Sequence, residues 1–341
     1  MSPGPSNSNN PYLTELIAGL EREGVAVGGI GPRVLWQADL VHLHWPDLAL
    51  SLPSAAASYA GAAKLVGLAA ACRLFRRPVV WTVHNLRPHE IRHRALDRLF
   101  WPVFTRLVSG YVSLTGAAVP LIERAHPGLR KAAHAVVPHG TYAGVYPSSS
   151  ESARAVRERL VGATNLLFFG QVRPYKGVPD LLQAFASVGT VDGTDVGLAV
   201  AGECLDPQER ARLERLATAD GRVTLNLGRV PDAEVAAWFE ATSGTVLPFI
   251  EGLNSGSVFL SLTMGRPVLV PRSAVFDELA GQVGSDWVQR YDDALTPDLL
   301  ERFATSGARL VAAGGSPDLS AFAWPGLAAA TAGFYRTLVS A

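Results

Sequence analysis

Short apolar segments typical of strands alternate with longer helix-like segments along most of the chain. Residues 39–45 alternate apolar and polar positions, residues 78–84 are rich in β-branched residues, and the Ala-rich residues 55–72 lie between them. A strand, a helix and a second strand in this order indicate a parallel βαβ unit. Residues 110–114 and 135–137 add two short strands. The first part of the chain is therefore predicted to be one α/β domain.

The pattern restarts after residues 147–152 (Pro-Ser-Ser-Ser-Glu-Ser), the most linker-like interior segment. Strands are expected at residues 165–169, 196–201, 223–226, 244–247 and 267–270, with helices at 179–188, 207–219, 232–241 and 257–265. We expect an N-terminal domain at 1–150, a second domain at 151–322, and a helix at 323–341 that packs back on the first domain. The fold class is predicted to be α/β, with two Rossmann-like doubly wound domains facing a cleft. Ligands of such sheets bind at the carboxyl ends of the strands.

Composition limits the kinds of molecule that the protein could bind and the compartment in which it could work. The 341 residues hold 30 Lys and Arg against 30 Asp and Glu, a balance that disfavours nucleic acid as a partner. Cys72 and Cys204 are expected to be reduced thiols, and no signal peptide is legible in residues 1–10, so a cytoplasmic location is predicted. Residues 55–72 approach the length of a membrane span, but Lys64 and the many alanines favour a helix packed in a soluble core. A peripheral contact with lipid stays open.

Two loops that follow predicted strands have the composition of anion-binding sites. The first runs from Gly170 to Gly177 and carries Arg173 and Lys176. Terminal glycines free its backbone, and the helix that follows adds partial positive charge, so the loop fits a diphosphate. The alternative is a solvated turn whose cations only confer solubility.

The second loop follows the strand at 244–247 and opens a helix. Ser255, Gly256 and Ser257 offer hydroxyls and N–H groups to an anion, and the Glu251 carboxylate could hold sugar or ribose hydroxyls. Ordinary N-capping by a serine is the alternative. There is no Asp-x-Asp pattern for a divalent metal, so we expect Arg173, Lys176 and helix N-termini to neutralise a leaving group.

Histidines gather at predicted strand ends in the first domain: His42, His44, His84, His89 and His139. Each one could be a structural, hydrogen-bonded residue or could act as a base near neutral pH. Residues 89–93 match the His-Glu-x-x-His pattern of zinc proteases, but Pro88 before them indicates a loop or a first helical turn. No metal is therefore expected.

These residues resemble the two-domain GT-B glycosyltransferases, in particular the bacterial glycolipid β-1,4-mannosyltransferases of exopolysaccharide synthesis. The resemblance is carried by Asn10-Pro11-Tyr12, His42-Leu43-His44-Trp45-Pro46, Trp81-Thr82-Val83-His84-Asn85, Pro88-His89-Glu90, Pro138-His139-Gly140 with Tyr142, residues 168–177, Ser255-Gly256-Ser257 and Gly265-Arg266-Pro267-Val268. It implies a nucleotide-sugar donor, best guessed as GDP-mannose, and a saccharide or lipid-linked acceptor bound by the N-terminal domain. It implies no separate cofactor.

The resemblance also implies roles for single residues. Arg173 and Lys176 would bind the diphosphate, and the expected donor site further includes Gly170, Glu251, Ser255, Gly256, Ser257, His139 and Gly140. For transfer with inversion, His84 or Glu90 is the predicted base. Arginines and aromatic residues on a helix at residues 92–108, Phe100, Trp101 and Phe104 among them, could meet anionic lipid or belong to a helix packed on the sheet.

The sequence departs from this family in two places. Many retaining relatives carry a second Glu eight residues after the position of Glu251, where this chain has Phe259. Relatives usually begin with a strand before the Asn-Pro-Tyr segment, so the start is truncated or residues 25–30 supply that strand. A retaining α-transferase that uses a UDP- or GDP-sugar, and a non-catalytic nucleotide-sugar-binding protein, stay open as alternatives.

Overall fold

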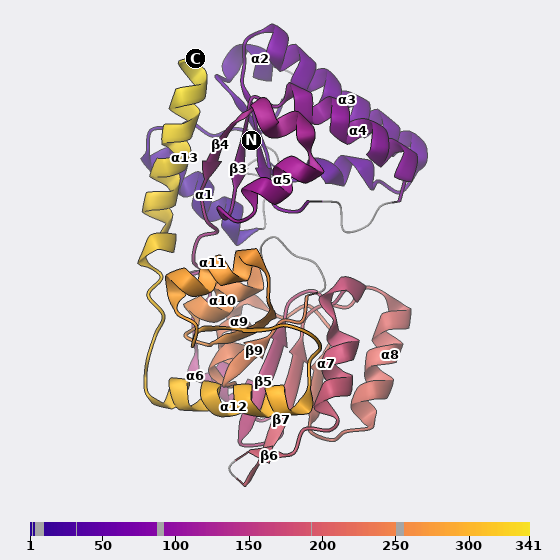
Figure 1. Cartoon of the computed structure of the whole chain (residues 1–341), viewed down its shortest axis with the longest axis vertical. Helices are drawn as coiled ribbons and strands as arrows, with labels where there is room; N and C mark the ends of the chain where they lie inside the picture. The colour runs from indigo at the N-terminus through magenta and orange to yellow at the C-terminus, as the bar shows by residue number, and fades with distance from the viewer. Residues whose placement is uncertain (2, 4–9, 32, 87–91, 192, 250–255) are drawn as a thin grey trace. The chain divides into compact units, whose positions relative to one another are not determined.

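The computed structural model describes residues 1–341 except 2, 4–9, 32, 87–91, 192 and 250–255 (Figure 1). The chain forms two compact units. Unit 1 comprises Met1–Gly140 and Ala321–Ala341, and unit 2 comprises Thr141–Ser320. The expected domain boundaries at residues 150 and 322 differ from the ends of these units, because the compact part of unit 2 already begins at residue 141.

Unit 1 contains a four-stranded parallel sheet in the order β1-β2-β3-β4. Its strands are β1 (Val41–Leu43), β2 (Val79–Val83), β3 (Gly110–Ser113) and β4 (Ala133–Val136). All residues of β1, β2 and β3 are buried, as expected for strands covered on both faces. The strands follow one another in chain order, so this sheet has no point at which the order reverses.

Helices from the two ends of the chain share one core in unit 1. The helices are α1 (Pro11–Arg22), α2 (Val34–Gln37), α3 (Ala55–Leu74), α4 (Arg94–Leu107), α5 (Val119–Ala125) and α13 (Trp324–Val339), with 3-10 turns at Pro46–Leu50 and Pro127–Lys131. Leu13 and Leu20 of α1 pack with Leu327 of α13 and with Val80 and Val112 of the sheet. Helix α13, yellow in Figure 1, therefore lies beside α1. Residues 25–30, one of the two alternatives for the family's first strand, form no strand.

Helix α3 differs from the expected core helix. Among the described residues it alone is long and apolar enough to cross a membrane by length and composition, yet only 22% of its most apolar window is buried. Its buried residues are Ser58, Ala62, Ala69 and Cys72, which form one narrow face. Ala-rich composition permits close packing along such a face but does not force burial of the rest. The expected helix is present, and it packs through this one face only.

Unit 2 contains the larger sheet, in the order β11-β10-β9-β5-β7-β6, with β8 also paired to β7. Its strands are β5 (Thr164–Phe169), β6 (Thr190–Val191), β7 (Thr194–Ala201), β8 (Val223–Asn226), β9 (Gly244–Val246), β10 (Val268–Pro271) and β11 (Val288–Tyr291). All neighbours are parallel except β6 and β7. The chain order reverses at β5, which pairs with β7 on one side and β9 on the other. This is the topology in which ligands bind beyond the carboxyl ends of the central strands.

The helices of unit 2 begin at sequence signals that can be named. They are α6 (Ser150–Arg157), α7 (Val178–Phe185), α8 (Pro207–Thr218), α9 (Asp232–Glu240), α10 (Gly256–Thr263), α11 (Ala274–Val283) and α12 (Pro297–Ala312). The Ser149 side chain caps α6 by accepting a hydrogen bond from the Ser152 N–H. Residues 150–152, expected in a linker, are therefore the first turn of a helix, because a serine that caps a helix has the same composition as a serine in a linker.

Candidate active site

Three loops converge at the carboxyl end of the unit 2 sheet because their glycines allow close backbone contact. Gly170, which follows β5, and Gly202, which follows β7, both have positive φ angles, 131° and 151°. A Cβ atom on Gly202 would lie 2.0 Å from the Gly170 carbonyl oxygen. Gly177 has φ 67°, and a Cβ atom there would lie 2.3 Å from the carbonyl oxygen of Pro248, which follows β9. Only glycine fits this arrangement.

The two loops predicted to bind a diphosphate are neighbours in the structure. A Cβ atom on Gly170 would lie 2.8 Å from Ser257 Oγ, so the start of α10 lies against the end of β5. Gly256 and Ser257 are the first residues of α10, whose free N–H groups favour an anion. Glu251 and Ser255, which we also expect in this site, lie outside the described residues.

Lys176 is a half-buried cation in the first of these loops. Its Nζ atom lies 4.0 Å from the centroid of the Phe249 ring and 5.4 Å from that of Tyr175. Burial, and then the nearby Arg173 guanidinium, lower the pKa of Lys176 to about 8. In the described part of the chain no carboxylate forms an ion pair with it, and Arg173 Nε donates to Gln171 Oε1 at 3.0 Å.

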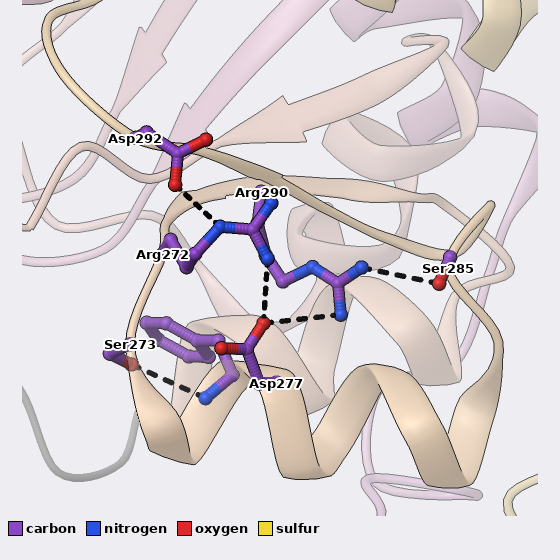
Figure 2. A network of polar contacts seen from close by, with 7 residues as sticks. Arg272, Ser273, Asp277, Ser285, Arg290 and Asp292 are labelled. Atoms are coloured by element: carbon purple, nitrogen blue, oxygen red, sulfur yellow. Dashed lines mark hydrogen bonds and ion pairs between the residues drawn. The ribbon is translucent and has the colours of Figure 1, made fainter.

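Two arginines near the ends of β10 and β11 are, by contrast, already neutralised (Figure 2). Arg272 contacts Asp292 at 2.5 Å and Asp277 at 2.9 Å, and Arg290 contacts Asp277 at 3.5 Å. The side chain of Asp277 thus holds both guanidinium groups to helix α11. We therefore assign these arginines to the local structure and not to a ligand.

In unit 1, four of the predicted histidines gather around Tyr12. The Tyr12 ring centroid lies 5.8 Å from that of His44, 5.2 Å from His84 and 4.9 Å from His139. His42 joins the group through His44, at 4.2 Å between centroids. Asn10 caps helix α1 by accepting from the Tyr12 N–H at 3.0 Å, which fixes Tyr12 at the start of that helix.

Hydrogen bonds divide these histidines by role. His42 bonds through both ring nitrogens, to Tyr335 Oη at 2.5 Å and to Thr82 Oγ1 at 2.8 Å, so it is a structural link between β1, β2 and α13. His44 Nδ1 bonds His84 Nε2 at 3.2 Å, while the buried His44 Nε2 has no partner among the described residues. Among the described residues, His44 therefore has one ring nitrogen with unused bonding capacity.

Burial keeps the whole cluster uncharged. It lowers the pKa of His42 to about 3 and that of His139 to about 4. It also holds the pKa values of His44 and His84 well below their usual value, and neighbouring imidazoles add to the effect. A neutral imidazole can accept a proton, but a depressed pKa makes it a weak base. His84 was one predicted base, and Glu90, the other, lies outside the described residues.

His139 and Gly140 belong to unit 1, although we expect them to contact the donor. His139 Nδ1 donates to the Gly140 carbonyl oxygen at 2.7 Å. A Cβ atom on Gly140 would lie 2.3 Å from the indole of Trp324, so the absence of a side chain lets that ring pack here. In the structure both residues join the Tyr12 cluster, and their donor contact stays a prediction.

A small, open pocket adjoins the cluster. Its lining residues are His44, Trp45, Asp47, Trp81, His84, Asn85 and Trp101. Sequence reasoning missed Asp47, Trp81 and Trp101 as site residues. Asp47 lies four residues beyond β1, so the rule that sites follow strands could have found it. Among the described residues, no group of three or more His, Cys, Asp or Glu side chains could hold a metal ion, and His89 and Glu90 lie outside them.

Comparison with known proteins shows which class of enzyme this fold belongs to. A family model described as "Glycosyl transferases group 1" matches residues 163–304, within unit 2. Sucrose-phosphate synthase from Thermosynechococcus elongatus has a similar structure, with a TM-score of 0.62 and 16% identity over 90% of this chain and 75% of that one. Anabaena HepE bound to UDP matches with a TM-score of 0.55 and 17% identity over 82% and 74%. These matches show the fold of the GT-B glycosyltransferases.

Sequence similarity narrows the class further. A GDP-mannose:glycolipid 4-beta-D-mannosyltransferase of Xanthomonas campestris pv. campestris is 32% identical over 331 residues, covering 94% of this chain and 86% of the relative. A second protein of the same description is 31% identical over the same shares. The chain therefore belongs to the glycosyltransferase family that includes these mannosyltransferases.

Proposed function

We propose that this enzyme transfers mannose from GDP-mannose to a hydroxyl of a glycolipid, with inversion at the anomeric carbon. The observation that carries the proposal is Lys176, a cation with no carboxylate partner in the described chain, beside glycine-lined loops and the start of α10. A site of this kind suits the diphosphate of a sugar donor. The description of the Xanthomonas relatives supports mannose, GDP and a glycolipid acceptor.

The reaction that we propose is a direct displacement. The acceptor oxygen forms a bond to the anomeric carbon as the bond to the diphosphate oxygen breaks, and GDP leaves with that electron pair. Lys176, Arg173 and the N–H groups at the start of α10 stabilise the charge that develops on the leaving group. A base removes the proton of the acceptor hydroxyl.

Donor choice is tested by a panel of GDP, UDP, dTDP and ADP in thermal-shift measurements. A ligand that binds only the folded protein raises its melting temperature by mass action. We expect GDP to give the largest shift, with and without EDTA, and expect product only with GDP-mannose and a glycolipid acceptor. A larger shift with UDP, or a shift that EDTA abolishes, would contradict the donor assignment or the metal-independent mechanism.

The stereochemical outcome is the finer part of the proposal. Phe259, which occupies the position of the second Glu of many retaining relatives, is buried in α10 and cannot supply a carboxylate. This favours inversion over the retaining alternative. NMR of the product's anomeric proton is the direct test: a β-mannoside supports inversion of the α-linked donor, and an α-mannoside would replace the proposal with a retaining reaction.

We also propose that unit 1 contacts a membrane surface from the cytoplasmic side. The residues Phe100 and Phe104 of α4 are buried, so the aromatic side of this helix packs inside and is not available to lipid. Its outer side instead exposes Leu99 and Val103 among arginines. Arg94, Arg98 and Arg106 lie on the same helix and suit anionic lipid. The neighbouring helix α3 ends in exposed Leu74.

Vesicle sedimentation tests this contact. We expect the wild type to bind vesicles that contain phosphatidylglycerol and expect Leu99→Glu with Val103→Glu to reduce binding at least tenfold. Leu205→Glu is the matched control, because Leu205 is 67% exposed in unit 2 while Leu99 is 65% exposed in unit 1. Equal loss in the control, or binding unchanged in the double variant, would refute the assignment to α4.

A further inference from the structure

The sequence motif Gly265-Arg266-Pro267-Val268 follows helix α10 directly and has no part in the proposed function. Gly265 has φ 64°, and its N–H donates to the carbonyl oxygen of Leu262 at 3.0 Å. The Arg266 N–H donates to the carbonyl oxygen of Ser261 at 2.9 Å. This pair of bonds around a left-handed glycine is a common way for a helix to end. The motif therefore fixes the point at which α10 stops.

The Arg266 guanidinium joins the carboxyl ends of two helices of unit 2. A helix leaves its last carbonyl groups without partners inside the helix, and a cation is favourable beside them. Arg266 donates to such oxygens at the end of α10 and at the end of α9: Met264 at 3.3 Å, Gly265 at 3.0 Å, Phe239 at 2.8 Å, Glu240 at 3.1 Å and Thr242 at 2.7 Å. One side chain thus holds the ends of α9 and α10 at a fixed distance from each other.

A second polar contact joins the same end of α10 to the sheet. Ser261 Oγ lies 2.7 Å from Thr245 Oγ1 of β9, and both residues are fully buried. Ser261 Oγ also donates to the Arg266 carbonyl oxygen at 3.0 Å. The other buried residues of α10 are apolar, and apolar contacts have no preferred direction. The hydrogen bonds at the carboxyl end therefore set the position and the rotation of this helix.

The other end of α10 lies in the candidate donor site, where Ser257 is packed against Gly170. The eight residues of α10 span only about 12 Å, so a small tilt at the carboxyl end displaces the first N–H groups. We propose that Arg266 is a positioning residue for the sugar donor: it holds α10 so that the N–H groups at its start can bind the diphosphate. The inference rests on the proposed function, and Arg266 itself does not touch the donor.

Arg266→Lys is the decisive variant, because it keeps the charge but replaces the planar guanidinium by one ammonium that cannot reach both helix ends. Calorimetry at a temperature at which the variant is folded should give a Kd for GDP roughly tenfold above that of the wild type, as for the loss of one hydrogen bond to a charged group. The Kd for guanosine, which has no phosphate, should stay within twofold. Thr245→Val, which removes only the hydroxyl that bonds Ser261, should raise the Kd for GDP about threefold.

Arg222→Lys is the matched control. The Arg222 guanidinium also donates to a carbonyl oxygen, that of Val188 at 2.6 Å, but it lies just before β8, at the amino end of that strand. This change should lower the melting temperature and leave the Kd for GDP within twofold of wild type.

Two results would overturn this inference alone. One is an Arg266→Lys protein that is less stable but binds GDP as the wild type does, and the other is an equal loss of affinity for guanosine and for GDP. If Arg266→Lys does not fold, an unchanged Kd for GDP in Thr245→Val overturns the inference instead. A wild type that prefers UDP would overturn the donor assignment, and the same comparison with UDP and uridine would still test Arg266.

Discussion

In unit 2 the candidate donor site is made mainly of backbone, whereas the candidate acceptor site in unit 1 is made of rings and titratable side chains. Gly170, Gly177 and Gly202 bring three loops together in unit 2, where Lys176 is the added charge. In unit 1, Tyr12 and four histidines form a buried, uncharged cluster beside a pocket of indoles. The site in unit 2 should therefore be sensitive to any added side-chain atom. The site in unit 1 should be sensitive to a change of pH.

Acidification should have the largest effect on stability, and it should destabilise unit 1. Folding lowers the pKa values of the cluster, to about 3 for His42 and about 4 for His139. The unfolded chain therefore binds more protons below about pH 6.5, and stability is lost as pH falls from there toward the folded values. At about 1.4 kcal/mol per pH unit for each histidine, we expect a loss of at least about 3 kcal/mol between pH 6.5 and 4.5.

Urea unfolding followed by tryptophan fluorescence measures this loss, because Trp45, Trp81 and Trp101 all report on unit 1. His44→Phe should reduce the slope of stability against pH, while His134→Gln, which lies outside the cluster, should leave it unchanged. A slope that is the same in all three proteins would show that the buried histidines do not control acid stability.

The next largest effect should come from one added methyl group in unit 2. Gly177→Ala puts a Cβ atom on a residue with φ 67° and against the Pro248 carbonyl oxygen, so we expect about 2–4 kcal/mol of destabilisation and weaker GDP binding. Gly144→Ala is the control, since Gly144 has φ 77° but nothing within 4 Å of its added Cβ. It should lose about 1 kcal/mol, measured by denaturant unfolding. Equal losses would mean that contact with Pro248 is unimportant.

Loss of the Lys176 charge should weaken donor binding without harming the fold. Lys176→Ala removes a charged contact worth about 2 kcal/mol, so we expect the Kd for GDP, measured by calorimetry, to rise roughly 30-fold. Because the pKa of Lys176 is lowered to about 8, wild-type affinity should fall as pH rises through this value. Arg272→Ala, which breaks a neutralised network, should stay within twofold of wild type. A similar loss in both variants would remove the distinction between them.

The smallest effect should follow from Tyr335→Phe. This change deletes the hydroxyl that bonds His42 Nδ1 and leaves a buried ring nitrogen without its partner. We expect about 1–2 kcal/mol of destabilisation by urea unfolding and no change in GDP affinity. A weaker affinity for GDP would show that unit 1 packing affects the donor site.

Most strands and helices could be predicted from the sequence, because buried parallel strands are apolar and helix starts carry caps. All nine strands that the patterns indicate are present within a few residues of the predicted ends. The failures have local causes. Residues 147–152 have linker composition but start a capped helix, and residues 25–30 have the apolar content of a strand but form none. Strands β6 and β11 were not predicted at all.

The candidate site could be predicted only in part. The glycines and cations after β5 could be recognised from the sequence, since an anion-binding loop needs both near each other in the chain. The pocket could not be predicted, because Asp47, Trp81 and Trp101 come from three separate segments and no local pattern links them. His42 could not be told from His44 either, until their hydrogen bonds were known.

The sequence by itself determined the α/β class, the two units and the glycines and cations of the loop from Gly170 to Gly177, because each depends on residues that are adjacent or periodic in the chain. Tertiary structure alone decided which charges are neutralised, which histidines are structural, and that Asp47 joins the indole pocket. Burial and pairing depend on residues distant in sequence, and those distances set the pKa values and the chemistry.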